Sequence, residues 1–220
     1  AAAIENARLF QAERERSAQL ATVSKVAESI TSTLDPDEVL HRTVEMITEA
    51  FGYYYASILL LDEEDQTLVY KASAGGFSGE APVTFRQALK EGMIGWVAHE
   101  GKTLLAKDVS QEPCYIRAFL TGTKSELDVP LKYRDKVIGV LDLQSEELNA
   151  FSEHDVMAME ALAGHVAAAI ENARLFGVAR QRVAELRAVR QASLQLTSTL
   201  ELEPVLETIL QHALDLVSAD

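Results

Sequence analysis

The chain has 220 residues, nearly half of them apolar, and a formal net charge of −14. Such a charge opposes binding to nucleic-acid backbones and to anionic membrane surfaces, which need clustered Lys and Arg. The single cysteine, Cys114, excludes a disulfide framework and a thiolate metal site within the chain and favours a reducing cytoplasm. No apolar stretch approaches the roughly 18 residues of a membrane span, so we expect a soluble fragment without direct membrane contact.

A long repeat organises the chain. Residues 3–10, Ala-Ile-Glu-Asn-Ala-Arg-Leu-Phe, return letter for letter as residues 169–176, and later matches keep the same offset. A period of this length indicates an array of whole domains. We therefore expect a piece of a longer protein, with a connecting helix over 1–34, one domain over 35–172, a connecting helix over 173–200, and the start of a second repeat over 201–220.

The first half of the domain predicts helices and hairpin strands. Residues 1–34 contain no Gly or Pro and favour one long helix. Asp35 and Pro36 are typical of the start of a new helix, which Gly52 ends. The elements expected next are strands over 55–61 and 68–72, short helices over 85–90 and 92–99, and a short strand over 103–106.

The second half predicts another hairpin and an exit helix. Residues 125–131 and 136–144 form the hairpin, and its last strand is apolar on both faces. A strand of this kind is usually covered on both sides. One sheet between helical layers follows, which is an α+β fold. Ser152 and Asp155 are spaced to cap the exit helix.

Apolar and small residues recur along the exit helix at spacings of four and three, typical of a coiled-coil seam between two chains. The seam comprises Leu162, Val166, Ala169, Ala173 and Phe176, with Arg180 at the next position. The register then shifts, as where a coiled coil is locally overwound or unwound. For the part before Phe176 there is an alternative interpretation. The same spacing of apolar residues is expected of a single helix that covers the core of its own domain.

Three sets of motifs resemble a GAF domain over residues 36–172. They are Glu91-Gly92-Met93-Ile94-Gly95-Trp96-Val97-Ala98 with Lys107-Asp108-Val109, Glu126-Leu127-Asp128-Val129-Pro130-Leu131 with Lys136-Val137-Ile138-Gly139-Val140-Leu141, and Phe151-Ser152 with Asp155. The resemblance implies a six-stranded antiparallel sheet with helices on both faces, flanked by long coiled-coil signalling helices. It also implies a place between other sensors and an output domain, as in bacterial multi-GAF sensor histidine kinases of two-component systems.

The resemblance further implies a small-molecule pocket between the sheet and its covering loops. It places six residues there: Trp96, Asp108, Cys114, Tyr115, Phe119 and Ser125. Aromatic walls with a few polar groups suit a small organic ligand. The alternative is that Trp96 and Phe119 fill a closed core.

The sequence motifs by which other GAF domains bind their ligands are incomplete in this chain. The cyclic-nucleotide signature, Asn-Lys-Phe-Asp-Glu, ends in Glu where this chain has Val156. Bilin attachment uses a Cys followed by His or within Asp-x-Cys-Phe, and Cys114 has neither context. Haem needs an axial ligand, for which His99 and His154 qualify by residue type alone. We expect none of these cofactors and no metal, and the ligand stays open.

Two functions remain open. The first is a cytoplasmic sensory and signal-transmission module that is a homodimer through its terminal helices, binds a small molecule and passes a signal to an output domain such as a histidine kinase. The alternative is a ligand-free dimerisation spacer. We expect no catalysis, because a GAF-fold reductase of free methionine sulfoxide uses several cysteines and Cys114 is alone. The ligand, the output domain and the sign of the signal do not follow from the sequence.

Overall fold

The computed structural model describes residues 21–30, 34–76, 85–116, 122–199 and 202–217, with side chains of the last two helices described only for 153–194 and 206–214. The chain divides into two units, Ala1–Phe176 and Gly177–Asp220. The elements are α2 Pro36–Phe51, β1 Tyr55–Asp62, β2 Thr67–Gly75, β3 Arg86–Ala88, α3 Gly92–Glu100, β4 Leu104–Ala106, the 3-10 helix η1 Val109–Gln111, β5 Ser125–Tyr133, β6 Lys136–Ser145, α4 Glu153–Thr199 and α5 Leu202–Val217. The first unit is an α+β domain, as predicted.

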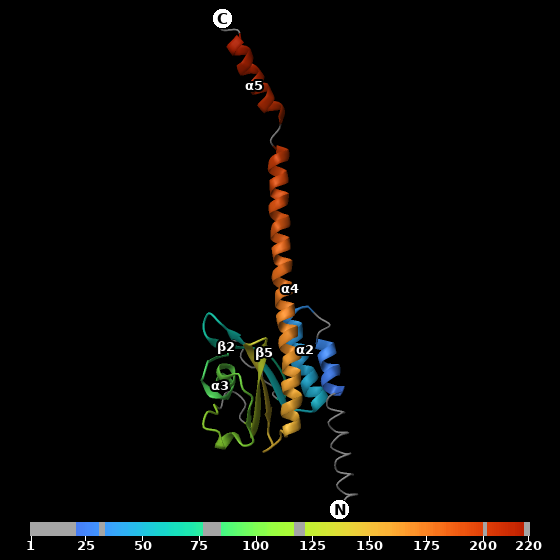
Figure 1. Ribbon diagram of the computed structural model, residues 1–220, viewed down its shortest axis with the longest axis vertical. Helices are drawn as coiled ribbons and strands as arrows, with labels where there is room; N and C mark the ends of the chain where they lie inside the picture. The colour runs from blue at the N-terminus through green and yellow to red at the C-terminus, as the bar shows by residue number, and fades with distance from the viewer. Residues whose placement is uncertain (1–20, 31–33, 77–84, 117–121, 200–201, 218–220) are drawn as a thin grey trace, which may run out of the picture. The chain divides into compact units, whose positions relative to one another are not determined.

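Six strands form one antiparallel sheet in the order β3-β2-β1-β6-β5-β4. Figure 1 shows α3 on one side of this sheet and α2 and the first part of α4 on the other. Successive side chains of a strand point to opposite faces. In β5, Leu127 and Val129 therefore join the core under α2 and α4, whereas Glu126 and Asp128 face the α3 side.

Helix α2 begins and ends where the sequence predicts. The Asp35 carboxylate accepts hydrogen bonds from the backbone amides of Asp37 and Glu38, at 3.0 and 3.3 Å. Gly52 ends the helix in the left-handed conformation with φ of 71°, which glycine adopts without steric cost. The face between these ends is buried against β1 and β2.

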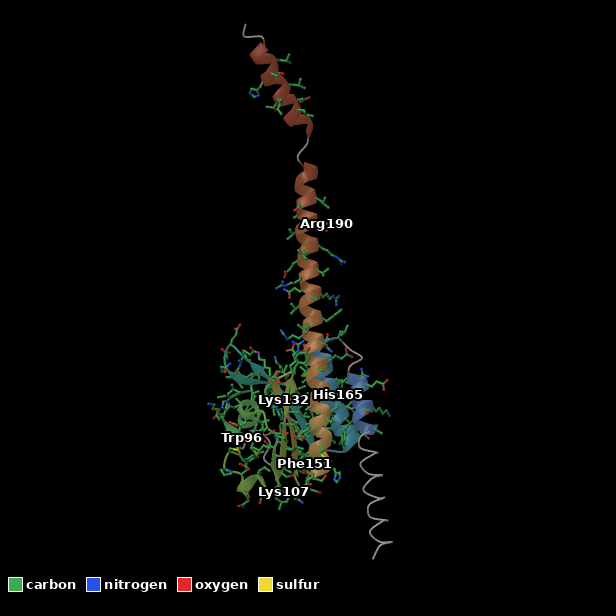
Figure 2. The ribbon with its side chains drawn as sticks, in the orientation of Figure 1. Trp96, Lys107, Lys132, Phe151, His165 and Arg190 are labelled. Atoms are coloured by element: carbon green, nitrogen blue, oxygen red, sulfur yellow. The ribbon has the colours of Figure 1, made fainter. Side chains whose placement is uncertain are left out.

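The start of α4 is fixed by a reciprocal cap, also as predicted. The Ser152 hydroxyl oxygen accepts from the Asp155 amide at 3.3 Å, and an Asp155 oxygen accepts from the Ser152 amide at 2.8 Å. The other Asp155 oxygen accepts from the Tyr53 hydroxyl at 2.8 Å. Phe151, at the beginning of α4 in Figure 2, is buried and lies against the Tyr53 ring. The cap therefore joins α4 to the loop after α2.

The seam residues of α4 fall into two groups. Leu162, Val166, Ala169 and Ala173 are no more than 4% exposed and pack in the same core as the sheet. The first part of α4 thus covers the core of its own domain and does not form a seam with another chain there. These four side chains are not free to contact a second chain. Phe176 and Arg180 are exposed, as is every residue of 177–194.

The prediction of a short helix over 85–90 is wrong. Residues Arg86–Ala88 form β3 and pair with Thr67, Leu68 and Val69 of β2. The free edge of β2 supplies a ladder of backbone partners, and the left-handed Lys90 (φ 72°) prevents helical continuation. An ion pair from Arg86 to Asp62 and Asp65 holds the strand at this edge.

The ends of the chain are described in part. Residues 21–30 of the helix expected over 1–34 are helical, and residues 3–10 of the repeat lie outside the described residues. Helix α5 occupies the positions that the repeat offset assigns to α2. Among the described helices, none has the length and apolar character to cross a membrane.

Candidate functional site: a buried carboxylate cluster

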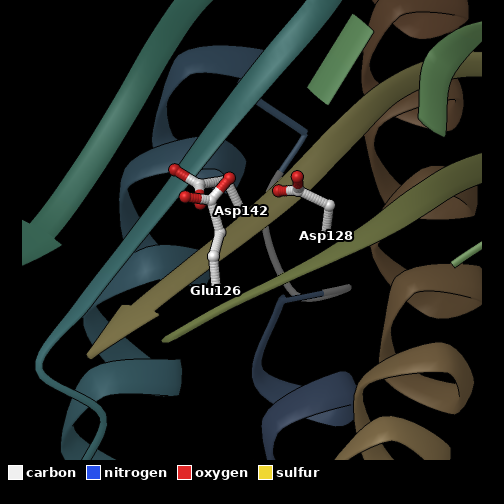
Figure 3. A group of neighbouring side chains, drawn as sticks. All are labelled: Glu126, Asp128 and Asp142. Atoms are coloured by element: carbon white, nitrogen blue, oxygen red, sulfur yellow. The ribbon is translucent and has the colours of Figure 1, made fainter. Parts of the chain in front are cut away.

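Three acidic side chains are buried together on the α3 face of the β5–β6 hairpin (Figure 3). Glu126 and Asp128 are alternate residues of β5, and Asp142 of β6 lies directly opposite Asp128. Their exposed fractions are 4%, 0% and 2%. One carboxylate oxygen from each lies within 4.8 Å of the others. Acidic residues are almost never fully buried unless they are paired, so this cluster is the main feature to explain.

The hydrogen bonds of the cluster are unevenly distributed. Asp142 accepts from the Ser57 hydroxyl at 2.9 Å and from the Gln144 amide nitrogen at 3.0 and 3.1 Å. Thr123 donates to the Gln144 amide oxygen at 2.6 Å and so fixes its orientation. No N–H or O–H group of the described residues donates to either oxygen of Asp128, and its polar neighbour is the Glu126 carboxyl, with which it forms a hydrogen bond once one of the two groups is protonated.

Burial raises the pKa of all three carboxyl groups because the charged form loses its hydration. This raises the pKa of Asp142 to about 6, although the donors from Ser57 and Gln144 favour the charged form. Burial and then the neighbouring carboxylates raise the pKa of Glu126 and Asp128 well above their ordinary values. An empty site therefore favours at least one protonated carboxyl group, and a bound cation would stabilise the charged forms.

The cluster adjoins a cavity on the α3 side. Its polar lining comes from Glu126, Asp142, Ser57, Gln87 and Gln144, and its walls are Leu59, Tyr70, Phe85, Met93, Ile94, Tyr115 and Ile116. The empty space out to the mouth is about 490 Å³, but the centre of a water molecule fits in only about 30 Å³ of it. In this conformation the cavity accommodates a small group such as an ammonium. Asp128 does not line the cavity.

The carboxylates of this cluster lie close enough together to hold a cation, and no other such group occurs among the described residues. Magnesium and calcium take six to eight oxygen ligands, including several waters. Beyond its polar lining, the walls of this cavity are instead aromatic and aliphatic carbon. Apolar walls with one charged end are typical of a site for an organic ligand.

Among the residues that the family resemblance places at the pocket, Tyr115 lines this cavity. Trp96 is half-buried among the apolar residues under α3, including Val97 (Figure 2). Phe119 lies outside the described residues.

The three polar residues expected at the pocket make local contacts instead. Asp108 caps η1 by accepting from the backbone amide and the hydroxyl of Ser110. Ser125 donates to the Glu147 carbonyl at 2.7 Å.

Cys114 donates to Glu112 at 3.3 Å, and burial followed by this hydrogen bond raises the pKa of its thiol to about 11. Since the thiolate is the nucleophile, Cys114 is poorly suited to attack at neutral pH.

Sequence reasoning missed Glu126, Asp128 and Asp142 as site residues, although a signal was present. The last strand of the hairpin is predicted to be covered on both faces, within a sheet between helical layers, and an acidic residue inside such a strand has no route to water. Two acids at alternate positions of one strand, and a third in the next strand, therefore indicate one buried cluster.

Comparison with known proteins agrees with this architecture. The pattern of the GAF domain family matches residues 33–171. GAF domain-containing protein A of Dictyostelium discoideum is 32% identical over 109 residues, covering 50% of this chain and 65% of that protein. Protein YtsP of Bacillus subtilis (strain 168) is 34% identical over 104 residues, covering 47% and 57%. The matched region thus spans less than two thirds of either relative.

Solved structures show the same fold. The GAF domain of an Acinetobacter phosphoenolpyruvate-protein phosphotransferase has a TM-score of 0.65 and 28% identity, covering 71% of this chain and 95% of that one. Free methionine-R-sulfoxide reductase from Neisseria meningitidis, in complex with its substrate, has a TM-score of 0.66 and 26% identity, covering 73% and 93%. This fold therefore occurs both as one domain of a phosphotransferase and in a reductase that binds a small substrate. With the sheet order, the two covered faces and these matches together, the chain belongs to the GAF domain family.

Proposed function

We propose that this chain is a sensory GAF module that binds a small organic molecule through a positively charged amine. The observation that supports it is the buried carboxylate cluster beside a cavity with apolar walls. Among the described ion pairs none involves Glu126, Asp128 or Asp142. A ligand cation is the partner that the domain itself does not supply.

An ammonium group suits the geometry. It has three hydrogen-bond donors and no acceptor, and it would meet Glu126 and Asp142 at the cavity and the charge of Asp128 beside them. Charge-assisted hydrogen bonds are shorter and stronger than neutral ones. The apolar walls then contact the carbon skeleton of the ligand.

The test compares two ligands that differ in charge. The chain is titrated with butylammonium and with 1-butanol by nuclear magnetic resonance, in phosphate because Tris is itself an amine. We expect butylammonium to bind at least about tenfold more tightly, since a hydrogen bond to a charged group contributes roughly 1.5–3 kcal/mol. L-methionine sulfoxide serves as an amino-acid probe, because a structural neighbour is a reductase of that compound.

Two variants locate the binding site. Asp142→Asn should abolish the preference for the charged ligand, because Asp142 lines the cavity. Asp135→Asn is the matched control, since Asp135 is an exposed acid in the turn of the same hairpin. Equal binding of both ligands to the wild type, or an effect of Asp135→Asn as large as that of Asp142→Asn, would refute the proposal.

The proposal extends to transmission through α4. This helix begins at the capped Ser152–Asp155 turn of the domain and continues to Thr199. In the second unit its large exposed apolar residues fall within an arc of about 160° at 100° per residue, together with two arginines. These apolar residues are Val178, Val183, Leu186, Val189 and Leu194.

We propose that this face pairs with the same face of a second copy, so that the dimer contact begins near Phe176 rather than at Leu162. Leu186 is 70% exposed and Val189 64% exposed, and pairing would remove both from water. Light scattering after gel filtration should give a dimer, and Leu186→Glu with Val189→Glu should give a monomer with a folded domain. Ala188→Glu is the charge control, because Ala188 is exposed on the opposite side of the helix. A wild-type monomer at high concentration contradicts the pairing.

The remaining parts of the proposal concern the whole protein. A ligand shifts the helix pair only if it binds its two packings with different affinities. Arg180 follows Phe176 at the seam spacing, at the point where the register of the apolar positions shifts, so Arg180→Leu should lock one packing. The output domain would be a histidine kinase or a comparable cytoplasmic signalling domain. A ligand-free spacer is the alternative, and failure of both amine probes would favour it.

We also propose that the domain is not an enzyme, although some neighbours are reductases. Cys114 lies outside the cavity lining, and its thiol is protonated at neutral pH. Incubation with methionine sulfoxide and a thiol reductant should give no methionine. Turnover that disappears in Cys114→Ser would overturn this part of the proposal.

A further inference from the structure

Asp128 has a different environment from the two carboxylates that line the cavity. It is fully buried, no N–H or O–H group of the described residues outside the cluster donates to it, and it does not line the cavity. It lies directly opposite Asp142 across the β5–β6 ladder. Like charges at directly opposed positions destabilise a sheet, so these two groups are not both stably charged without a cation.

Among the described residues, the titratable groups that act on Asp128 come from three segments. They are Glu126 on β5, Asp142 on β6, and the Cys114 thiol from the loop after η1. None of them is a cation. Burial and the adjacent Glu126 and Asp142 charges all favour the protonated form of Asp128, and they raise its pKa.

We propose that Asp128 holds a proton while the site is empty and that a cation bound at Glu126 and Asp142 expels this proton to solvent. The inference rests on the proposed amine-binding function and adds its regulation by pH. The O–H bond of the Asp128 carboxyl breaks, the proton passes to a buffer base, and the carboxylate stays beside the ligand ammonium. The positive charge of the ligand ammonium replaces that of the Asp128 proton, so the total charge of the buried site is conserved.

This exchange makes the proton a competitor of the ligand. Affinity should therefore rise as the pH rises, by about tenfold per pH unit where one full proton is exchanged. Asp128 acts here as a positioning residue. Its charge affects the ligand indirectly, through the neighbouring carboxylates of Glu126 and Asp142. Its side chain determines how strongly ligand binding depends on pH.

The test is isothermal titration calorimetry with butylammonium in two amine-free buffers of different ionisation enthalpy, repeated at several pH values. For the wild type we expect close to one proton released per ligand bound. Asp128→Asn should release fewer protons and flatten the pH profile of the dissociation constant. Asp135→Asn should match the wild type in both measurements.

The outcomes separate this inference from the proposed function. Butylammonium binding without proton release and without pH dependence would overturn the inference and leave amine binding intact. Full proton release in Asp128→Asn would remove the assignment to Asp128. An absence of butylammonium binding at every pH would overturn the proposed function, and the inference with it.

Discussion

Replacement of Asp128 by Asn tests the energetic cost of the cluster in the empty protein. The side chains are nearly equal in shape, and the Asn amide can donate to the carboxylates beside it. The wild-type carboxylate has no such donor among the described residues. A buried group left without a partner costs roughly 1–3 kcal/mol. We therefore expect Asp128→Asn to increase the free energy of unfolding by about 1–3 kcal/mol at pH 8.

The pH dependence of this difference follows from the raised pKa of the acids. A carboxyl group with a higher pKa in the folded state binds more protons there than in the unfolded state. Its stabilising effect is complete at low pH and is lost as the pH rises through the folded pKa. For Asp142 the pKa rises from 3.8 to about 6. This group should therefore lower the free energy of unfolding of the wild type by at most about 3 kcal/mol as the pH rises across that interval. The variant and the wild type should differ least near pH 5, because the free-energy cost of keeping the Asp128 proton, which the unfolded chain releases, grows with each pH unit above the ordinary carboxyl pKa.

The assay is urea unfolding followed by circular dichroism at pH 5 and pH 8, in phosphate and acetate buffers without amines. Asp135→Asn, at an exposed acid of the same hairpin, should change the free energy of unfolding by less than about 0.5 kcal/mol at both pH values. Two results would refute the reasoning. One is lower stability of Asp128→Asn at pH 8, and the other is an equal difference from the wild type at both pH values.

Three further substitutions test the packing around the site. Gly139→Ala should destabilise the domain by about 1–3 kcal/mol or more, because the new methyl group would collide with the Leu59 carbonyl on β1. Gly164→Ala should instead stabilise α4 by about 0.5–1 kcal/mol, since nothing lies within 4 Å of the new methyl group. Asp35→Ala removes the cap of α2 and should cost about 1 kcal/mol. Thermal unfolding of the three variants checks the signs, and Gly139→Ala as stable as Gly164→Ala would contradict the close contact between β1 and β6.

Much of the fold was predictable because local sequence determines it. Asp35 and Gly52 define the ends of α2 through capping and a left-handed residue, and both lie where expected. The β5–β6 hairpin follows from its apolar pattern. Residues 85–90 were mispredicted because β3 depends on the free edge of β2, a partner distant in sequence that local propensity does not report.

The site was harder to predict, because its residues converge only through strand pairing. Asp128 and Asp142 are opposite each other only in the register of the β5–β6 ladder. The family resemblance places Trp96 and Ser125 at the pocket. In the structure Trp96 packs in an apolar cluster, and Ser125 donates a hydrogen bond to the backbone. The periodicity of α4 is compatible with burial in its own domain or with a dimer seam, and tertiary structure assigns Leu162 to the domain core.

The most direct test of the account is a crystal structure of the domain grown with butylammonium. The account predicts the ligand nitrogen in the cavity, within about 3 Å of carboxylate oxygens from both Glu126 and Asp142, with the butyl chain against the apolar walls. A ligand bound only at the surface, with the cavity dry and the three carboxylates unchanged, would contradict the central claim that this buried acidic cluster is a cation-binding site.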